Sequence, residues 1–215
     1  MNLAKNYFKT TSVNWKFYWQ SKIFRTQIFI GIFFIATILT CFPFFFQYIE
    51  QRNGYVINDI ILNSITPENV STPIFILIWS SAFFMLITAI KDPDIFLIFL
   101  IAYVILCFAR IITISLFPLQ TPPGIIVLID PLSNHFYGTT FITKDLFFSG
   151  HASTLFLMYL CQRKVFKKYF ILFSCIAVAV LVLVQHIHYF IDVLFAFPFA
   201  YVCFKLSEYL TFKAT

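Results

Sequence analysis

Charged residues are scarce in this sequence. Asp, Glu, Lys and Arg together make up 11% of its 215 residues, whereas soluble domains average about 25%. Hydrophobic residues account for 60% of the chain and aromatic residues for 21%. So little charge cannot cover a water-exposed surface, which excludes an ordinary soluble domain. The composition predicts an all-α, polytopic membrane protein.

Cysteine motifs are also absent. None of the five cysteines belongs to a CxxC pair, and all five lie within or at the ends of apolar runs. We interpret them as small membrane-buried side chains. Zinc is not favoured either, because one HxH pair and one remote histidine only weakly indicate a metal site. We therefore expect no metal and no cofactor.

The first 25 residues lack an apolar core of the length found in cleavable signal peptides. They instead mix aromatic residues with five cations. This composition is typical of a helix that lies at the lipid headgroups, with its rings inward and its cations outward. We expect residues 1–25 to form an amphipathic interfacial segment and residues 26–215 to form one membrane domain. The five cations are Lys5, Lys9, Lys16, Lys22 and Arg25.

Six apolar runs follow, and they predict six transmembrane helices. Charged or proline-containing segments separate them, including a polar loop at residues 47–72, a tight turn at 91–94 and a proline-rich segment at 118–144. The predicted spans are residues 26–46, 73–90, 95–117, 145–161, 169–184 and 189–206.

The distribution of cations predicts the orientation. With six spans, both termini share one side, and twelve of the fifteen Lys and Arg residues fall on that side. Cytoplasmic segments are enriched in cations, so we expect both termini to be cytoplasmic. The net charge of +6 then reflects topology, and we expect no nucleic-acid partner. The twelve are Lys5, Lys9, Lys16, Lys22, Arg25, Lys91, Arg163, Lys164, Lys167, Lys168, Lys205 and Lys213.

Titratable residues within apolar runs need an explanation, because each costs a few kcal/mol near the middle of a membrane helix. Asp192 lies in the sixth run, and His188 precedes it by four positions, which would place both on one helix face. A carboxylate beside an imidazole fixes its tautomer and stabilises its charged form, as a nucleophilic or general-base histidine requires. The alternative is a polar clamp between helices.

His151 favours the catalytic interpretation. It begins the fourth run at the same expected depth and follows Ser149 and Gly150. Glycine permits close backbone approach, and Ser149 with the N–H groups at a helix start can hold an anion. Together with Arg110, these residues predict a phosphate site near the outer face. We expect His186 to be interfacial and His135 to be solvated in its loop.

Two sequence elements resemble a known family. KDLFFSGHA from Lys144 and HYFIDVLFAF from His188 resemble the type 2 phosphatidic acid phosphatase superfamily, and more closely its sphingomyelin synthase branch. An upstream arginine-threonine-leucine-proline element is echoed from Arg110, so the resemblance covers roughly residues 105–202. The phosphatases usually carry an arginine-proline pair, PSGH and a serine-arginine pair. Here Ile111, Phe148 and Leu181-Val182 stand at those positions, which favours the synthase-like branch.

The resemblance implies a two-step reaction. His188 attacks phosphorus to form a phosphohistidine that Asp192 supports, while His151 protonates the leaving alcohol and later deprotonates the acceptor. It also implies substrate-binding roles for a further group of residues. These are Arg110, Lys144, Asp145, Ser149 and Gly150.

The expected function is therefore that of an integral membrane lipid phosphotransferase with membrane lipids as donor and acceptor. A lipid phosphate phosphatase using the same residues is the alternative, and a non-catalytic membrane scaffold is a third possibility. The compact loops favour a bacterial inner membrane, with the site facing the periplasm.

Overall fold

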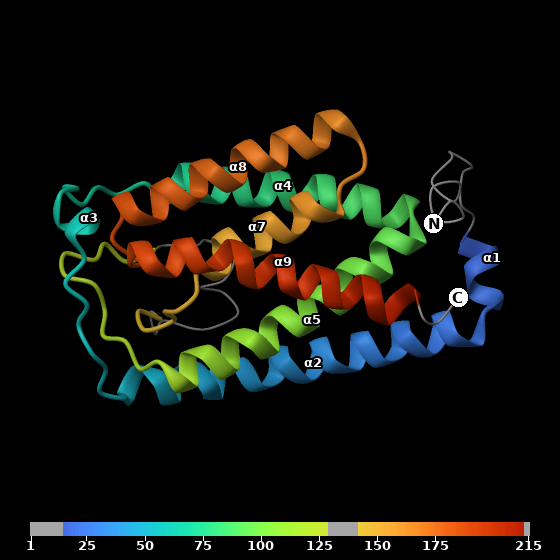
Figure 1. The fold of residues 1–215 in the computed structure, drawn as a ribbon, viewed down its shortest axis with the longest axis horizontal. Helices are drawn as coiled ribbons and strands as arrows, with labels where there is room; N and C mark the ends of the chain where they lie inside the picture. The colour runs from blue at the N-terminus through green and yellow to red at the C-terminus, as the bar shows by residue number, and fades with distance from the viewer. Residues whose placement is uncertain (1–14, 129–141, 213–215) are drawn as a thin grey trace.

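The computed structural model describes residues 15–128 and 142–212, and within these ranges the chain is a bundle of helices (Figure 1). The only β-type pairing there is an isolated bridge between Tyr55 and Leu119, so the expected all-α class is confirmed for this part of the chain. The helices are α1 Trp15–Gln20, α2 Lys22–Gln51, α3 Ile60–Asn63, α4 Ser71–Lys91, α5 Pro93–Leu116, α7 Gly150–Cys161, α8 Val165–Val184 and α9 Phe190–Phe212.

The short helix α7 is the centre of the bundle. It packs against α4, α5, α8 and α9, whereas α2 packs along the outside of α5. Small or apolar α7 residues such as Ala152 and Leu155 lie in a continuous core with Val178 of α8 and Ala196 of α9. The helix with the fewest residues among the six main ones is therefore the most enclosed.

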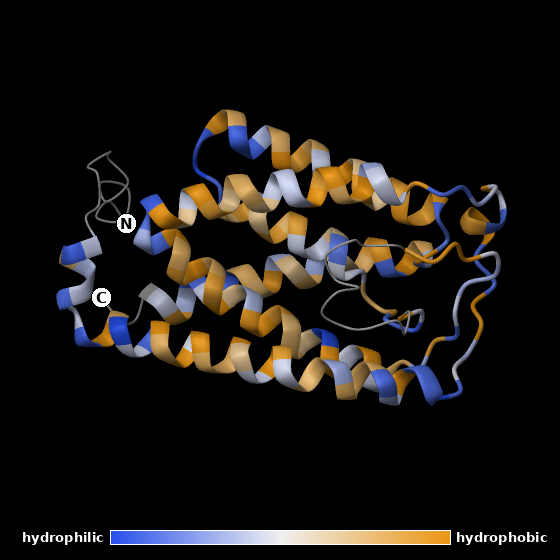
Figure 2. Ribbon diagram, turned by 180° about the vertical axis from the view of Figure 1, so that it is seen from behind, coloured by the Kyte–Doolittle hydropathy of each residue, from blue (hydrophilic) through white to orange (hydrophobic). Residues whose placement is uncertain are grey.

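Within the described residues, five helices are long and apolar enough to cross a membrane: α2, α4, α5, α8 and α9. Figure 2 shows hydrophobic residues along these helices and hydrophilic residues gathered mainly towards the two ends of the bundle. These features support a multi-pass integral membrane protein. The predicted count of six spans is not confirmed, because α7 has 12 residues and is only ~18 Å long, against a hydrocarbon core of ~30 Å.

The N-terminal helices differ from the predicted division at residue 25. Ser21 ends α1 and caps α2, accepting a hydrogen bond from the Phe24 backbone N–H at 3.3 Å. The helix then continues through Pro43 to Gln51, several residues beyond the predicted end of the first span. Trp15 anchors α1 by donating from Nε1 to the Ile90 carbonyl at 2.6 Å. Residues 1–14 of the expected interfacial segment lie outside the described residues.

The predicted tight turn at residues 91–94 is confirmed. Asp92 ends α4 through its N–H, which donates to the Thr88 carbonyl at 2.9 Å, and starts α5 through its carboxylate, which accepts from the Ile95 N–H at 3.3 Å. Pro93 occupies the first turn of α5, where its missing N–H is harmless. Arg163 at the start of the α7–α8 connection pairs with Asp92 at 3.0 Å.

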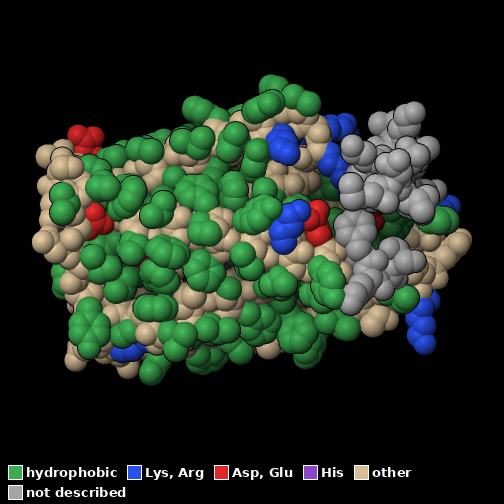
Figure 3. Space-filling view, in the orientation of Figure 1, with side chains coloured by type: hydrophobic (Ala, Val, Ile, Leu, Met, Phe, Trp, Pro, Cys, Tyr) green, Lys and Arg blue, Asp and Glu red, His purple; other side chains and the backbone are tan. Residues whose placement is uncertain are grey.

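The cations separate as the sequence predicts. The end of the bundle near α1 also carries the end of α4, the α7–α8 connection and the end of α9 (Figure 1), and Figure 3 shows most visible Lys and Arg side chains towards that end. The cytoplasmic location of this end stays a prediction. Its described cations are Lys16, Lys22, Arg25, Lys91, Arg163, Lys164, Lys167, Lys168 and Lys205.

Candidate active site

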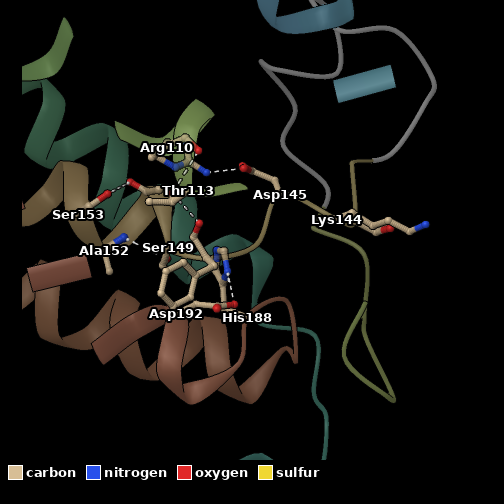
Figure 4. Close-up of polar contacts among 12 residues, drawn as sticks. Arg110, Thr113, Lys144, Asp145, Ser149, Ala152, Ser153, His188 and Asp192 are labelled. Atoms are coloured by element: carbon tan, nitrogen blue, oxygen red, sulfur yellow. Dashed lines mark hydrogen bonds and ion pairs between the residues drawn. The ribbon is translucent and has the colours of Figure 1, made fainter. Parts of the chain in front are cut away.

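Three segments meet inside the half of the bundle that lies away from α1. The first is the C-terminal part of α5, with Arg110 and Thr113. The second is the strap, residues 142–149, which leads into α7. The third is the turn at residues 185–189, which leads into α9. Figure 4 shows Arg110, Asp145, Ser149, His188 and Asp192 close together at this junction.

His188 and Asp192 form the most buried pair of the site. His188 Nδ1 lies 3.4 Å from Asp192 Oδ2, and the two side chains are 5% and 0% exposed. The expectation that both stand on one helix face is wrong, because α9 begins only at Phe190. The carboxylate instead folds back over the first turn, where Oδ2 accepts from the Tyr189 backbone N–H at 3.0 Å. This contact resembles half of a capping box.

The orientation of this pair identifies the reactive nitrogen. Because Nδ1 of His188 faces the carboxylate, Nε2 is the nitrogen left for chemistry. Among the described residues, neither His188 Nδ1 nor Asp192 Oδ1 has a partner that meets hydrogen-bond criteria. Buried polar atoms are normally satisfied, and exceptions are often functional.

His151 completes the group. It occupies the first turn of α7, and its ring centroid lies 6.2 Å from that of His188. His151 is partly exposed, whereas His188 is 4% exposed. The two rings, from elements far apart in the chain, are therefore neighbours in an edge-to-face arrangement.

Ser149 holds the start of α7 and joins it to α9. Its Oγ caps the helix by accepting from the Ala152 N–H at 3.4 Å, and its own N–H donates to the Asp192 carbonyl at 3.0 Å. The Oγ and the backbone N–H of Ser149 are thus both engaged within the protein. The helix start that it fixes is where backbone N–H groups lack helical partners and can receive an anion.

Arg110 lies directly against Gly150. A Cβ on Gly150 would lie 2.6 Å from Arg110 Cζ, so only glycine leaves space for the guanidinium there. Arg110 Nη2 pairs with Asp145 Oδ1. Its Nε is buried and has no hydrogen-bond partner in the described part of the chain, so the guanidinium keeps donor capacity for an anion.

Lys144 is not brought to the histidines. Its side chain points away from them in Figure 4, and its Nζ donates to the carbonyls of Glu50 at 2.9 Å and Arg52 at 2.7 Å. The Glu50 carboxylate in turn accepts from the backbone N–H groups of Thr143 and Lys144. Lys144 and Glu50 therefore fasten the strap to the end of α2.

Several supporting contacts carried no signal in the sequence, although Thr113 itself belongs to the arginine-threonine element echoed from Arg110. Thr113 Oγ1 donates to the Phe147 carbonyl of the strap at 2.9 Å. Asp59 Oδ2 accepts from the Phe190 N–H at 2.6 Å and so caps α9 from a distant loop. These are long-range contacts of isolated polar residues, which no local spacing can reveal. Tyr189, in contrast, belongs to the HYFIDV element, so the sequence did carry a signal for it.

Tyr189 supports the same turn. Its hydroxyl donates to the Gln120 carbonyl at 3.0 Å and accepts from the Ile57 N–H at 3.4 Å. Burial raises the pKa of Tyr189, so the hydroxyl stays a donor across the physiological range. Loops from three parts of the chain thus meet beside His188.

Of the other two histidines, the structure describes His186 alone. His186 is buried, because the loops after α3 and α5 fold over the turn that carries it and its ring contacts one backbone carbonyl of each. Its position at the level of the membrane interface stays a prediction. His135 lies outside the described residues.

Apolar surfaces flank the site. A narrow hollow, too small to hold a water molecule, lies between α2 and α5, and Arg110 and Asp145 belong to its lining. Its apolar lining consists of Phe42, Phe45, Phe46, Ile111 and Ile114. On another side, the ring of Phe147 packs at 4.8 Å from Phe117 and at 5.3 Å from Phe195, measured between centroids.

Comparisons with known proteins identify one match. Residues 144–209 match the family model described as PAP2 superfamily C-terminal, and this range includes most of the strap, α7, α8 and most of α9. The match supports the superfamily that the sequence elements resemble, and with it a lipid enzyme of the phosphatase or phosphotransferase type. No curated protein and no solved structure matches this chain.

Proposed function

We propose that this protein is an integral membrane lipid phosphotransferase that moves a phospho-headgroup between lipids through a phosphohistidine intermediate. One observation carries the proposal. His188, oriented by the buried Asp192, lies beside His151 at the start of α7. A nucleophile, the group that orients it and a second histidine for proton transfer are the components that two-step phosphoryl transfer needs.

In the first step, Nε2 of His188 attacks phosphorus and forms an N–P bond, while the bond from phosphorus to the donor alcohol oxygen breaks. His151 gives its proton to that oxygen. Asp192 stabilises the positive charge that develops on the His188 ring. The result is a phosphohistidine and a free alcohol, with His151 left neutral.

In the second step, His151 removes the proton from an acceptor hydroxyl, and the acceptor oxygen attacks phosphorus. The N–P bond breaks and returns its electron pair to Nε2 of His188. Charge on the phosphate oxygens is stabilised by Arg110 and by the N–H groups at the start of α7. Because Asp145 pairs with Arg110 in the resting structure, substrate phosphate competes with that carboxylate.

The surroundings support lipid substrates. The lining of the narrow hollow between α2 and α5 combines apolar side chains with the Arg110–Asp145 pair. A lipid has the same combination of a charged headgroup and apolar chains. The synthase-like resemblance points to ceramide or diacylglycerol as acceptors.

Two phenylalanines favour transfer over hydrolysis. Phe148 is fully buried and stacks on Phe199 at 4.6 Å between centroids, and Phe147 packs against Phe117 and Phe195. We infer that this aromatic wall, formed where the strap leads to Ser149 and His151, limits the access of water, which competes with the lipid hydroxyl. The alternative, a lipid phosphate phosphatase, uses the same histidines with water as acceptor, and the superfamily match supports both.

The decisive experiment incubates the protein with fluorescent ceramide, fluorescent diacylglycerol and labelled phosphatidate in membranes that contain phospholipid donors, and separates the products by chromatography. A new lipid that carries the headgroup supports transfer, and released phosphate alone supports hydrolysis. His188→Ala and His151→Ala must each remove the product while membrane insertion persists. Near-wild-type turnover by His188→Ala would refute the histidine mechanism.

We also propose a bacterial inner membrane location with the site facing the periplasm. The separation of cations towards the α1 end supports this orientation. Cysteines introduced at the exposed positions Asn63 and Phe17, in a variant without Cys41, test it. The Asn63→Cys thiol should react with an impermeant reagent from the outside and the Phe17→Cys thiol should not. The reverse pattern contradicts the orientation.

A further inference from the structure

His186 occupies a position that normally requires glycine. Gln185 caps the C-terminus of α8, the His186 N–H donates to the Leu183 carbonyl at 3.0 Å, and the Ile187 N–H donates to the Val182 carbonyl at 3.1 Å. These two bonds define a Schellman motif with His186 at its left-handed position, and its φ is 56°. Because a side chain is strained at this φ, the histidine ring needs a reason to be there.

The ring contacts two acceptors. His186 Nδ1 lies 2.8 Å from the Pro123 carbonyl oxygen, and Nε2 lies 3.0 Å from the Ile65 carbonyl oxygen. Carbonyl oxygens accept hydrogen bonds and cannot donate them, and a neutral imidazole has only one N–H. Both contacts are hydrogen bonds only when the ring carries a proton on each nitrogen.

The location suits a positive charge. The ring follows the C-terminus of the 20-residue helix α8, where the helix dipole is negative. The charged groups on the elements packed around it are Asp59 and Glu68 on the loop before α4 and Asp192 on α9, while described residues 118–128 carry none. Within the described residues, no carboxylate lies at ion-pair distance from His186, so backbone dipoles hold the charge.

We propose that His186 is a positioning residue: as an imidazolium, it fastens the loops at residues 64–70 and 118–128 to the turn that carries His188. We call the two contacts of the His186 ring, with the Pro123 and Ile65 carbonyls, the clamp. The effect of the clamp on catalysis rests on the proposed function. His188 is two residues further on, so movement of the turn changes its distance from Asp192 and His151. The ring charge thereby links the outer loops to the reactive nitrogen.

Neighbouring contacts support the clamp. Gln185, which is fully buried, donates from Nε2 to Ser71 Oγ at 2.8 Å, and its carbonyl accepts from the Ile126 N–H at 3.0 Å. The Glu68 N–H donates to the Val184 carbonyl at 3.0 Å. Gly124 lies beside the His186 ring, and its φ of 77° is a conformation that glycine adopts without strain.

His186→Gly gives a sharp test, because glycine is the residue that the backbone prefers. If the ring contributed nothing, the variant would be as stable as the wild type or more stable. We expect its Tm to be several degrees lower at pH 6. His186→Asn, which tolerates the same φ without the charge, should behave like His186→Gly.

Nitrogen-15 NMR of histidine-labelled protein shows directly which nitrogens of the His186 ring are protonated. The His186 signals, assigned by their absence from His186→Gly, should show two protonated nitrogens at pH 6. One protonated nitrogen at pH 6, or a His186→Gly Tm at or above wild type at every pH, would overturn the proposal. The lipid assay then tests positioning: kcat should fall about tenfold or more with little change in KM, and unchanged kcat contradicts it.

These outcomes separate the clamp from the proposed reaction. The Tm and NMR measurements do not depend on turnover, so they can support the charged clamp even if the wild type transfers no headgroup. Conversely, a wild type that transfers headgroups with a neutral His186 retains the proposed function and refutes the clamp.

Discussion

Asp192 Oδ2 lies 3.4 Å from His188 Nδ1 while the same oxygen accepts a hydrogen bond from the Tyr189 N–H. One carboxylate oxygen thus both orients the imidazole and caps the first turn of α9. The two roles depend on different properties, because a cap needs an acceptor, whereas the developing imidazolium needs a negative charge.

Asp192→Asn separates these roles. An asparagine oxygen can still accept from Tyr189, so the fold should persist, but the charge that supports His188 is lost. We expect kcat to fall about 100-fold or more, with little change in Tm. Asp192→Ala should lose both activity and stability. Retained wild-type kcat in Asp192→Asn would assign Asp192 to helix capping alone.

A substrate whose leaving group needs no protonation distinguishes the roles of His151 and His188. A phosphodiester with a nitrophenyl leaving group needs no proton donor in the first step. His151→Ala should therefore release about one nitrophenolate per protein in a burst and then stall, because deprotonation of the acceptor is impaired. His188→Ala should release none. A burst from His188→Ala and none from His151→Ala would exchange the assigned roles.

Gly150→Ala should disturb the anion site. Its Cβ would overlap the Arg110 guanidinium, so we expect kcat/KM to fall about tenfold or more. The double variant with Arg110→Ala should be no worse than Arg110→Ala alone, because both changes act on one contact. Gly31→Ala, which crowds the Leu100 side chain away from the site, is the matched control. Strict additivity of Gly150→Ala and Arg110→Ala would contradict the shared contact.

Lys144→Ala tests the strap. The Nζ contacts with Glu50 and Arg52 predict a loss of about 1–3 kcal/mol in unfolding free energy, visible as a lower Tm. The KM for the lipid donor should change little, because the side chain points away from the histidines. A large rise in KM at unchanged Tm would restore the substrate-binding role that the sequence motif implies.

Phe147→Gly tests the choice of acceptor. Phe147 has a φ of 49°, so glycine preserves the backbone conformation while it removes the ring. Without that ring the aromatic wall opens, and the ratio of hydrolysed to transferred headgroup should rise. The ratio is measured from phosphate or phospho-headgroup released against new lipid formed. An unchanged ratio would assign acceptor choice to other residues.

The sequence predicted the elements of this protein better than their contacts. Hydropathy located all six main helices, because apolar runs bounded by charge are a local property. It could not show that α7 begins only at Gly150, since the apolar residues of the strap are buried by packing rather than by helix formation. The end of α2 was also missed, because polar residues after Phe46 continue the helix.

The site residues were predictable where they belong to sequence motifs with a recognisable spacing. Charged and titratable residues are rare in apolar runs, and this rarity pointed to His151, His188, Asp192 and Arg110. The structure brings these four residues together. Lys144 shared a motif with them, yet its direction depends on the distant Glu50. The burial of His186 was not predicted, because it depends on two loops that no local pattern connects to it.

The short length of α7 has a consequence for the membrane around it. Helix α8 is ~30 Å long and α7 only ~18 Å, and the two meet at residues 162–164 near the α1 end. His151 therefore lies ~12 Å inside the level reached by the far end of α8. In the proposed transfer, a lipid headgroup must move from the headgroup layer towards the middle of the bilayer to reach His151. The reaction rate should therefore depend on bilayer thickness.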